Sequence, residues 1–307
     1  MKVWIPHEQG RVLVEQTPGL TVEVAEGPDQ LPSDPAGVRF WVPPFLSTRE
    51  VVALASRLPD LKVVQLLSAG ADVWVDRLPA GVTLCDARGV HDSSTAEWVV
   101  TAILSRLRRF DTLARAQSRR EWAYGEVAPT DELAGKRVLI VGAGSIGEAL
   151  RARLAPFEVS FTLVARTARP DQDVHGVDEL PALLPQADVV VLLVPLTDAT
   201  RGLVDKAFLG AMPDGALLVN AARGPVVDTT ALVAELAAGR IDAALDVTDP
   251  EPLPADHPLW ELPNVLITPH VAGSVRGLLP RAYRLAAEQV RRMVAGEPLE
   301  NVVTNGY

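Results

Sequence analysis

The sequence predicts an α/β fold built from two domains, each formed around a parallel sheet. Short apolar runs alternate with helical patterns and turn clusters along most of the 307 residues. This alternation of strand, helix and strand favours parallel sheets, because a crossover must connect parallel neighbours. The length and the 48% hydrophobic content suit two domains with ample cores.

The first 90 residues carry the pattern of the first domain. Apolar runs predict strands at 2–6, 20–24, 38–42, 61–67 and 81–85. The stretch 47–58 predicts a helix with Ser47 or Thr48 as its N-cap. A longer helical pattern runs from Ser94 to about Arg120, and a polar, loop-like stretch follows it.

A second α/β unit begins near Arg137. Its predicted strands are RVLIVG, FTLVA, DVVVLLVP, ALLVNAA, AALDV and NVLIT. Helical segments separate most of these strands, which matches a doubly wound parallel sheet. The last helical pattern, about 277–296, has no strand after it and can return to pack on the first domain.

The charge balance argues against a nucleic-acid partner. The net charge is −10, so a large basic surface is not expected. The densest basic run falls on the predicted long helix, where a solvated helix face or a subunit contact explains it. This run consists of Arg106, Arg108, Arg109, Arg115, Arg119 and Arg120.

The chain carries one cysteine, Cys85, which lies in an apolar run and predicts a packed core thiol. The first residues lack the apolar region of a signal peptide. The longest strongly apolar run, 189–196, is far short of the ~20 residues that span a bilayer. We therefore expect a cytoplasmic protein without membrane association, and we expect no metal site.

The stretch VLIVGAGSIGEAL predicts a dinucleotide site. Gly142 allows a tight turn, Gly144 lets the backbone approach a pyrophosphate, and Gly147 lets helix and strand pack closely. The start of the helix then offers free N–H groups to the phosphates. Glycines also make plain structural turns, but the position after VLIV and before a helix favours cofactor binding.

The stretch LVARTARP (163–170) follows the glycine loop where NAD-selective sites place an acid, and it offers Arg166 and Arg169 instead. A guanidinium pairs with a 2′-phosphate that a carboxylate would repel, and Thr167 adds a hydroxyl. This pattern favours NADP(H). The alternative is that both arginines are solvated and that Asp171 or Asp173 supplies the acid.

Polar residues follow the later strands: Arg223 in VNAARG, Asp246 and Glu251 in ALDVTDPEPL, and His270 in NVLITPHVAG. The carboxyl ends of parallel strands share one edge of the sheet, so these side chains should converge beside the cofactor. A guanidinium can bind the carboxylate of a 2-keto acid, and an imidazole can donate the proton that carbonyl reduction requires. Glu251 can orient the ring of His270 and stabilise its protonated form.

Each of these residues also has a structural interpretation. Arg223 alone can be a salt-bridge donor, and Glu251 alone can be an exposed loop acid. The other histidines are interpreted as surface or packed residues: His7, His91, His175 and His257. Acid, base and arginine on successive strand ends favour catalysis over these readings.

At this point the chain resembles the D-isomer-specific 2-hydroxyacid dehydrogenase family. The matching motifs are GAGSIG, VPLTDAT, LLVNAARGPVVD, ALDVTDPEPL and NVLITPHVAG, with AGADVWV and GVHDSSTAEWVV as weaker ones. FWVPPF (40–45) and VARTARP are similar to the glyoxylate/hydroxypyruvate reductase branch. His91 departs from the asparagine of many relatives, and Glu251 departs from the glutamine of the formate branch.

The resemblance implies a Rossmann dinucleotide domain at 97–276 and a flavodoxin-like substrate domain formed by 1–96 with 277–307. It implies that Arg223 binds substrate, that His270 is the acid/base with Glu251 as its partner, and that backbone groups at Ala69 and Gly70, in the loop 68–71, bind the substrate carboxylate. It implies Asp246 near the nicotinamide carboxamide, and a homodimer. The expected cofactor contacts are Gly142, Gly144, Ser145, Ile146, Gly147, Arg166, Thr167, Arg169, Pro195, Thr200, Ala221 and Asp246.

The leading hypothesis is therefore NADPH-dependent reduction of a small 2-keto acid, such as glyoxylate or hydroxypyruvate, to the D-2-hydroxy acid. An NAD-dependent enzyme with a bulkier 2-keto acid is the runner-up. A dinucleotide-sensing regulator without catalysis is a third possibility, which the intact catalytic triplet disfavours. Apolar residues that can line the substrate pocket or simply belong to the core are Trp41, Pro43, Pro44, Phe45 and Trp260.

Overall fold

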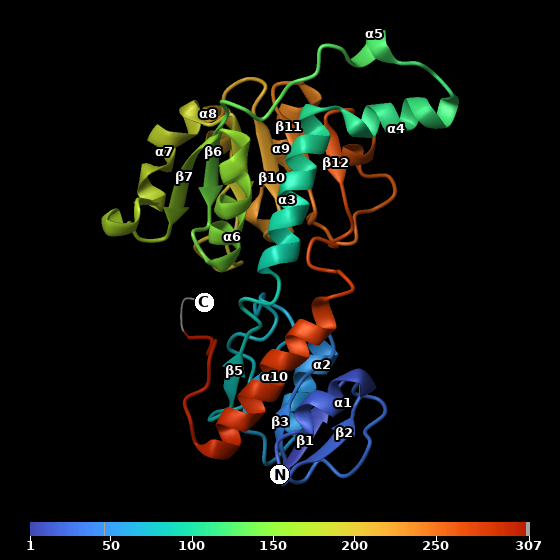
Figure 1. The fold of residues 1–307 in the computed structure, drawn as a ribbon, viewed down its shortest axis with the longest axis vertical. Helices are drawn as coiled ribbons and strands as arrows, with labels where there is room; N and C mark the ends of the chain where they lie inside the picture. Colours follow the sequence, from blue (N-terminus) through green and yellow to red (C-terminus); the bar gives the residue numbers. More distant parts are fainter. Residues whose placement is uncertain (46, 305–307) are drawn as a thin grey trace. The chain divides into compact units, whose positions relative to one another are not determined.

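The computed structural model describes residues 1–45 and 47–304. The chain forms two compact units (Figure 1). Unit 1 combines Met1–His91 with Val275–Tyr307, and unit 2 is Asp92–Ser274. The chain therefore passes between the units twice, directly before the long helix α3 and a few residues after His270.

Unit 1 contains a parallel sheet in the order β2-β1-β3-β4-β5. This is the flavodoxin-like order, in which chain direction along the sheet reverses between β1 and β3. Each strand predicted from the sequence is present. The bounds are β1 Lys2–Ile5, β2 Thr21–Val24, β3 Val38–Trp41, β4 Val63–Gln65 and β5 Thr83–Cys85.

Helix α2 (Arg49–Leu54) begins after Thr48, whose hydroxyl accepts from the backbone N–H of Val51 at 3.5 Å. A 3₁₀ turn, Ala55–Arg57, continues it. Helix α10 (Leu278–Ala295) packs on this unit, as expected, and its buried face shares a core with β1, β3 and β4. Its buried apolar residues are Leu278, Ala282, Tyr283, Ala286 and Val290.

Helix α1 (Glu8–Val14) was not predicted from the sequence. Gly10 in its middle lowers helix propensity by roughly 1 kcal/mol relative to alanine, so the local pattern is weak. The structure explains this glycine, because a Cβ there would lie 2.1 Å from the ring of Tyr283 on α10. The formation of α1 therefore depends on its packing against α10 rather than on local helix propensity.

Unit 2 contains a parallel sheet in the order β12-β11-β10-β9-β6-β7-β8. Chain direction reverses between β6 and β9, which is the doubly wound arrangement. Its strands are β6 Arg137–Val141, β7 Ser160–Ala165, β8 Val174–Gly176, β9 Val189–Leu192, β10 Leu217–Asn220, β11 Asp242–Leu245 and β12 Val265–Ile267. The sequence prediction missed only the short edge strand β8, whose residues VHG give no apolar run.

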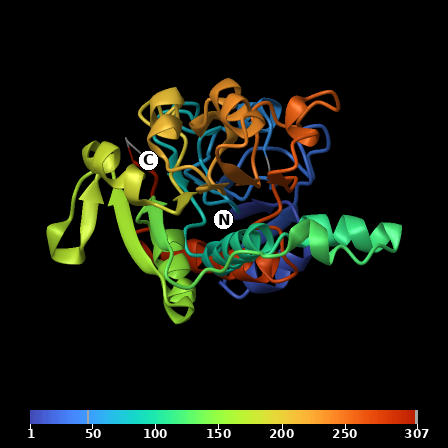
Figure 2. The ribbon, with the colours of Figure 1, turned by 90° about the horizontal axis from the view of Figure 1, so that it is seen from above.

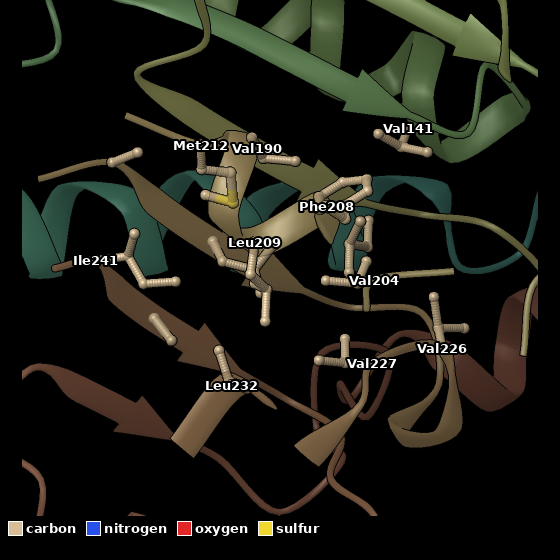
Figure 3. Close-up of a cluster of buried hydrophobic side chains, with 14 of the residues drawn as sticks. Val141, Val190, Val204, Phe208, Leu209, Met212, Val226, Val227, Leu232 and Ile241 are labelled. Atoms are coloured by element: carbon tan, nitrogen blue, oxygen red, sulfur yellow. The ribbon is translucent and has the colours of Figure 1, made fainter. Parts of the chain in front are cut away.

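The α-helices of unit 2 are α3 Asp92–Leu107, α4 Phe110–Arg119, α5 Tyr124–Val127, α6 Ser145–Leu154, α7 Leu180–Leu183, α8 Lys206–Ala211 and α9 Thr229–Ala237. Its 3₁₀ turns are Ala155–Phe157, Pro170–Gln172, Val177–Glu179, Leu184–Gln186, Gly224–Val226 and Pro258–Trp260. One face of the sheet packs on α8 and α9 through valine, leucine and phenylalanine side chains such as Val190, Phe208 and Leu232 (Figure 3). This buried layer fixes the strands whose carboxyl ends are followed by the candidate site residues.

The single long helix predicted between Ser94 and Arg120 is wrong. The chain breaks at Arg109, whose φ of 54° lies in the left-handed region, and α3 and α4 are separate helices. Arg106 is also no part of a solvated face, since it is 1% exposed. Its guanidinium donates to Asp111 at 2.8 Å and to Asp242 at 2.9 Å, which turns the chain and ties α3 to the start of β11.

Cys85 is fully buried, and burial raises the pKa of its thiol to about 12. This confirms the prediction of a packed core thiol. In the part of the chain that the structure describes, no helix combines the length and apolar character that a membrane crossing requires.

Candidate active site

The glycine loop lies between β6 and α6, and its geometry fits a dinucleotide. Gly142 has a φ of +125°, and a Cβ on it would lie 2.6 Å from the Leu193 carbonyl. A Cβ on Gly147 would lie 2.3 Å from the Gly142 carbonyl oxygen, so this glycine permits close packing of helix and loop. At Gly144 a Cβ would meet nothing within 4 Å, and no side chain caps α6 there. The start of α6, at Ser145 and Ile146, thus presents an open, uncapped N-terminus suited to a pyrophosphate.

The loop after β7 carries the basic residues predicted for the adenosine end of the cofactor. Arg166 and Thr167 are exposed, as are the alternative acids Asp171 and Asp173. Arg169 differs from them, because it is partly buried and its Nη2 donates to the carbonyl of Ala143 at 2.8 Å. This bond joins the loop after β7 to the glycine loop.

The segment after β9 is shaped by hydrogen bonds within itself. The Thr200 hydroxyl donates to the carbonyl of Pro195 at 2.6 Å and accepts from the N–H of Thr197 at 2.8 Å. On the neighbouring strand end, the N–H of Ala221 donates to the carbonyl of Leu192 at 3.3 Å. Pro195, Thr200 and Ala221 therefore follow β9 and β10, at the edge of the sheet where the glycine loop also lies.

Arg223 follows β10 and is held by residues that sequence reasoning did not select. The side chain of Asn220 accepts from the N–H of Ala222 at 3.0 Å and donates to the carbonyl of Arg223 at 3.1 Å. At Gly224 a Cβ would lie 1.9 Å from the carbonyl oxygen of Thr248, so the loops after β10 and β11 are pressed together. The guanidinium of Arg223 is partly exposed, with Nη1 donating to the carbonyl of Ala222 at 2.8 Å.

His270 and Glu251 form the closest pair of titratable groups in the site. His270 Nδ1 lies 2.6 Å from Glu251 Oε1. Burial acts to raise the pKa of the Glu251 carboxyl, but the hydrogen bond and the charge of His270 outweigh it. A backbone hydrogen bond at Thr248 and the positive charge of Arg223 add to this, and the pKa lies below its ordinary value. Glu251 is therefore an anion at neutral pH, and Arg223 lies close enough to contribute to its charge state.

The buried carboxylate of Asp246 holds the loop that carries His270. It accepts from the Thr268 hydroxyl at 2.6 Å and from the N–H groups of Val271 and Ala272, each at 2.9 Å. The Asp246 carbonyl accepts from the N–H of His270 at 2.7 Å. His270 itself has a φ of 55°, so its strained backbone is fixed from both sides. The role implied by resemblance, a contact to the nicotinamide carboxamide, stays a prediction for this residue.

The loop predicted to bind the substrate carboxylate follows β4 in unit 1. Ser68 donates its hydroxyl to the carbonyl of Gly70 at 2.8 Å, and the N–H of Trp74 donates to the carbonyl of Ala71 at 2.8 Å. Ala69 and Gly70 are partly exposed in this turn. The loop therefore keeps a defined shape at the carboxyl end of its own sheet.

His91, the departure from the common asparagine, is 6% exposed. Its Nε2 lies 2.8 Å from the Leu67 carbonyl, and its ring stacks on Phe45 at 6.0 Å between centroids. His7 and His175 contact Tyr283 and Glu179, and His257 caps the turn Pro258–Trp260. His91 is therefore a buried residue of unit 1, and the other three are partly buried and contact neighbouring groups; that none of the four is catalytic stays a prediction.

Of the candidate pocket residues, Trp41 is a core residue, 1% exposed and packed edge-on against Trp74. Pro43 is buried as well, whereas Pro44 and Phe45 are partly exposed and Trp260 is exposed. Within residues 1–45 and 47–304, no group of three or more histidine, cysteine or acidic side chains is placed to hold a metal ion.

The family model for "D-isomer specific 2-hydroxyacid dehydrogenase, NAD binding domain" matches residues 100–272, more than half of the chain. The chain belongs to this family. This D-2-hydroxyacid dehydrogenase is 37% identical over 252 residues to a glyoxylate reductase from Thermofilum pendens, covering 78% of this chain and 74% of that protein.

Solved structures of the family share the whole fold. A D-isomer specific 2-hydroxyacid dehydrogenase from Xanthobacter autotrophicus, in complex with NADPH and MES, aligns with a TM-score of 0.84 at 34% identity over 99% of both chains. An NADPH-dependent glyoxylate/hydroxypyruvate reductase from Sinorhizobium meliloti, in complex with NADP and sulfate, aligns with a TM-score of 0.83 at 28% identity over 98% of both chains. The protein is therefore an NAD(P)-dependent oxidoreductase with a Rossmann-like cofactor fold, as the sequence predicted.

Proposed function

We propose that the enzyme reduces a small 2-keto acid of the glyoxylate or hydroxypyruvate type to the D-2-hydroxy acid, with NADPH as the preferred cofactor. The observation that carries this proposal is the pair of His270 and Glu251 at 2.6 Å with Arg223 beside it on the neighbouring strand end. The named activity of the Thermofilum and Sinorhizobium relatives supports the substrate class. The NADPH and NADP bound to related structures support the cofactor.

The residues that would hold the cofactor suit its chemical groups. The pyrophosphate would lie on the open N-terminus of α6, where Gly144 leaves room and Ser145 and Ile146 offer N–H groups. Arg166 and Thr167, which are exposed after β7, would contact a 2′-phosphate. When bound, the nicotinamide supplies a hydride to the substrate carbonyl carbon.

The protein's own side chains would supply binding and the proton. Arg223 would bind the substrate carboxylate and polarise the carbonyl through its partly exposed guanidinium. Because Nδ1 of His270 is bonded to Glu251, its Nε2 is the nitrogen that would donate a proton to the developing alkoxide. Anionic Glu251 would stabilise the imidazolium before transfer, and Asp246 would keep the His270 loop in place.

Unit 1 would act as the substrate domain. The turn at Ala69 and Gly70 would give backbone N–H groups to the substrate carboxylate. We assign the substrate role to unit 1 and the cofactor role to unit 2, in place of the predicted bounds 1–96 with 277–307 and 97–276. The alternative, an NAD(H)-dependent dehydrogenase for a bulkier 2-keto acid, would require different substrate contacts in these loops and no 2′-phosphate contact at Arg166.

A panel of 2-keto acids assayed with both NADH and NADPH tests the proposal. We expect glyoxylate or hydroxypyruvate with NADPH to give the highest kcat/KM. A clear preference for NADH would remove the cofactor part, and a clear preference for branched or aromatic keto acids would remove the substrate part. Cofactor binding without turnover of any keto acid would favour the sensing regulator.

We also propose that the enzyme is a homodimer that uses the arm formed by α4 and α5. Both ribbon views show α4 extending away from the sheet of unit 2 (Figures 1 and 2). The arm carries large exposed apolar side chains: Phe110 at 59%, Trp122 at 95% and Tyr124 at 73%. Such a group is more typical of an interface than of a free surface. Light scattering should give the dimer mass, and Trp122→Glu with Tyr124→Glu should lower it.

We propose a cytoplasmic location as part of the same assignment, because a chain with a single cysteine, Cys85, makes no internal disulfide. The thiol is fully buried, and its raised pKa keeps it protonated. Cell fractionation with an antibody to the chain would test this location. Recovery from a secreted or membrane fraction would contradict it.

A further inference from the structure

Arg169 makes contacts unlike those of the other basic residue in its loop. Its Nη2 donates to the carbonyl of Ala143, inside the glycine loop, at 2.8 Å. Its Nε is buried and meets no acceptor among the residues that the structure describes. Arg166, three residues earlier, is exposed. Two of the three guanidinium nitrogens of Arg169 are therefore turned into the protein.

The backbone of Arg169 is fixed as well. Its N–H donates to the carbonyl of Val174 at 2.7 Å, and the N–H of Val174 donates back at 3.2 Å. These bonds pin Arg169 to the start of β8, at the base of the loop that follows β7. The side chain of Arg169 therefore extends from a fixed backbone. This lowers the conformational entropy that is lost when its guanidinium binds the carbonyl of Ala143.

The backbone of the glycine loop, which accepts the hydrogen bond from Arg169, is fixed as well. The N–H of Ala143 donates to the carbonyl of Val164 at 3.1 Å, and the N–H of Gly142 donates to the same carbonyl at 2.8 Å. The carbonyl of Ala143 is taken by Arg169. The peptide groups before Gly144 are thus held by β7 and its loop, while the uncapped N–H groups that follow stay available to a phosphate. The orientation of those N–H groups depends on the peptide that Arg169 fixes.

We propose that Arg169 is a positioning residue that latches the glycine loop for the pyrophosphate and serves NADH and NADPH equally. Arg166 and Thr167, rather than Arg169, then discriminate the 2′-phosphate. This assignment differs from the expectation that Arg169 contacts the cofactor directly. It rests on the proposed cofactor site, but not on the preference for NADPH over NADH.

The test measures dissociation constants of NADH, NADPH and ADP by calorimetry in Arg169→Met, Arg169→Lys and Arg166→Met. Methionine keeps the apolar stem but removes the donor and the charge. Arg169→Met should weaken all of these ligands by a similar factor of about 10, since a charge-assisted bond that orders the site is lost. Arg169→Lys keeps a charged donor and should recover most of that loss. Arg166→Met should weaken NADPH alone.

A matched control is Arg151→Met on α6, which removes one positive charge from an exposed pair with Glu148. It should leave the affinities within about twofold, because exposed pairs contribute little. Hydrogen exchange without cofactor gives a second readout. In Arg169→Met the hydrogen-bonded amides of Gly142 and Ala143 should exchange faster, while those of β9 and β10 should not change.

Two outcomes would overturn the latch. Selective weakening of NADPH in Arg169→Met would make Arg169 a 2′-phosphate ligand, and unchanged ADP affinity with unchanged exchange would show that the contact orders nothing. Failure of the proposed function is distinguishable from both. If the wild type ignores glyoxylate and hydroxypyruvate, or prefers NADH, the ADP affinities and the exchange rates still decide the role of Arg169.

Discussion

The pairing of Glu251 with His270 leads to a prediction about the pH dependence of reduction. In the proposed mechanism reduction requires a protonated His270, so activity should fall as pH rises. An anionic Glu251 at 2.6 Å stabilises the protonated form. The pKa of Glu251 is itself lowered, so this carboxylate stays charged throughout the pH range of the assay. Glu251→Gln removes the charge and keeps the shape, and activity should then fall at a lower pH than in the wild type.

The size of the effect follows from the geometry. Two unit charges about 4 Å apart attract by about 4 kcal/mol at an effective dielectric constant near 20. The side chains of His270 and Glu251 are 30% and 41% exposed, so solvent screening reduces this considerably. A remaining interaction of about 1–2 kcal/mol corresponds to a loss of roughly 5- to 30-fold in kcat/KM on the alkaline limb. We therefore expect this limb to lie at lower pH in Glu251→Gln than in the wild type.

The assay is the pH–rate profile of keto-acid reduction under saturating cofactor, in buffers of constant ionic strength. Glu261→Gln serves as the control, because it neutralises an exposed carboxylate in the same stretch of chain. The control profile should overlay that of the wild type. An unchanged limb in Glu251→Gln, or a limb moved to higher pH, would remove Glu251 from this role.

Three further predictions test the remaining parts. His270→Ala should lower kcat by ~10²–10⁴-fold while the calorimetric affinity for cofactor is kept, and turnover near the wild-type level would reject it as the proton donor. Arg223→Ala should lower kcat/KM by about three powers of ten because the substrate carboxylate loses its charge-assisted pair, and near-normal glyoxylate turnover would count against that role. Arg106→Met should lower the free energy of unfolding by about 2 kcal/mol in urea, since it removes the buried cation shared by Asp111 and Asp242, while Asp111 keeps Arg115 as a partner and Asp242 is partly exposed. Exposed Arg108→Met should change it by less than about 0.5 kcal/mol, and equal effects would refute the structural role of Arg106.

The fold was predictable where local pattern and packing agree. Strands buried on both faces, such as β9 (VVVL) and β10 (LLVN), are short runs made almost entirely of apolar residues, which is the composition expected of central parallel strands. The errors have local causes. Helix α1 was missed because Gly10, which lowers helix propensity, is required by the close contact with Tyr283. The break after α3 was missed because Arg109, where it occurs, is a good helix former.

The candidate site divides along a similar line. Arg223, Glu251 and His270 could be selected because their chemistry is unusual at a strand end and suits one reaction. Asn220 could not, because its amide is fully committed to the backbone around Arg223 and gives no motif of its own. Hydrogen bonds from a side chain to a distant backbone group depend on the fold, so they can be read only after the chain is placed.

Asp246 shows how far this dependence reaches. As a carboxylate at a strand end it invites a role in binding, yet both of its oxygens accept from the loop of His270. His270, the proposed proton donor, lies on a strained backbone that would relax if that loop were free. A proton donor must stay within hydrogen-bond reach of the carbonyl oxygen while the reaction proceeds. In the proposed mechanism the buried side chain of Asp246 therefore acts on the chemistry through the position of His270, just as the proposed role of Arg169 acts on the cofactor through the position of the glycine loop.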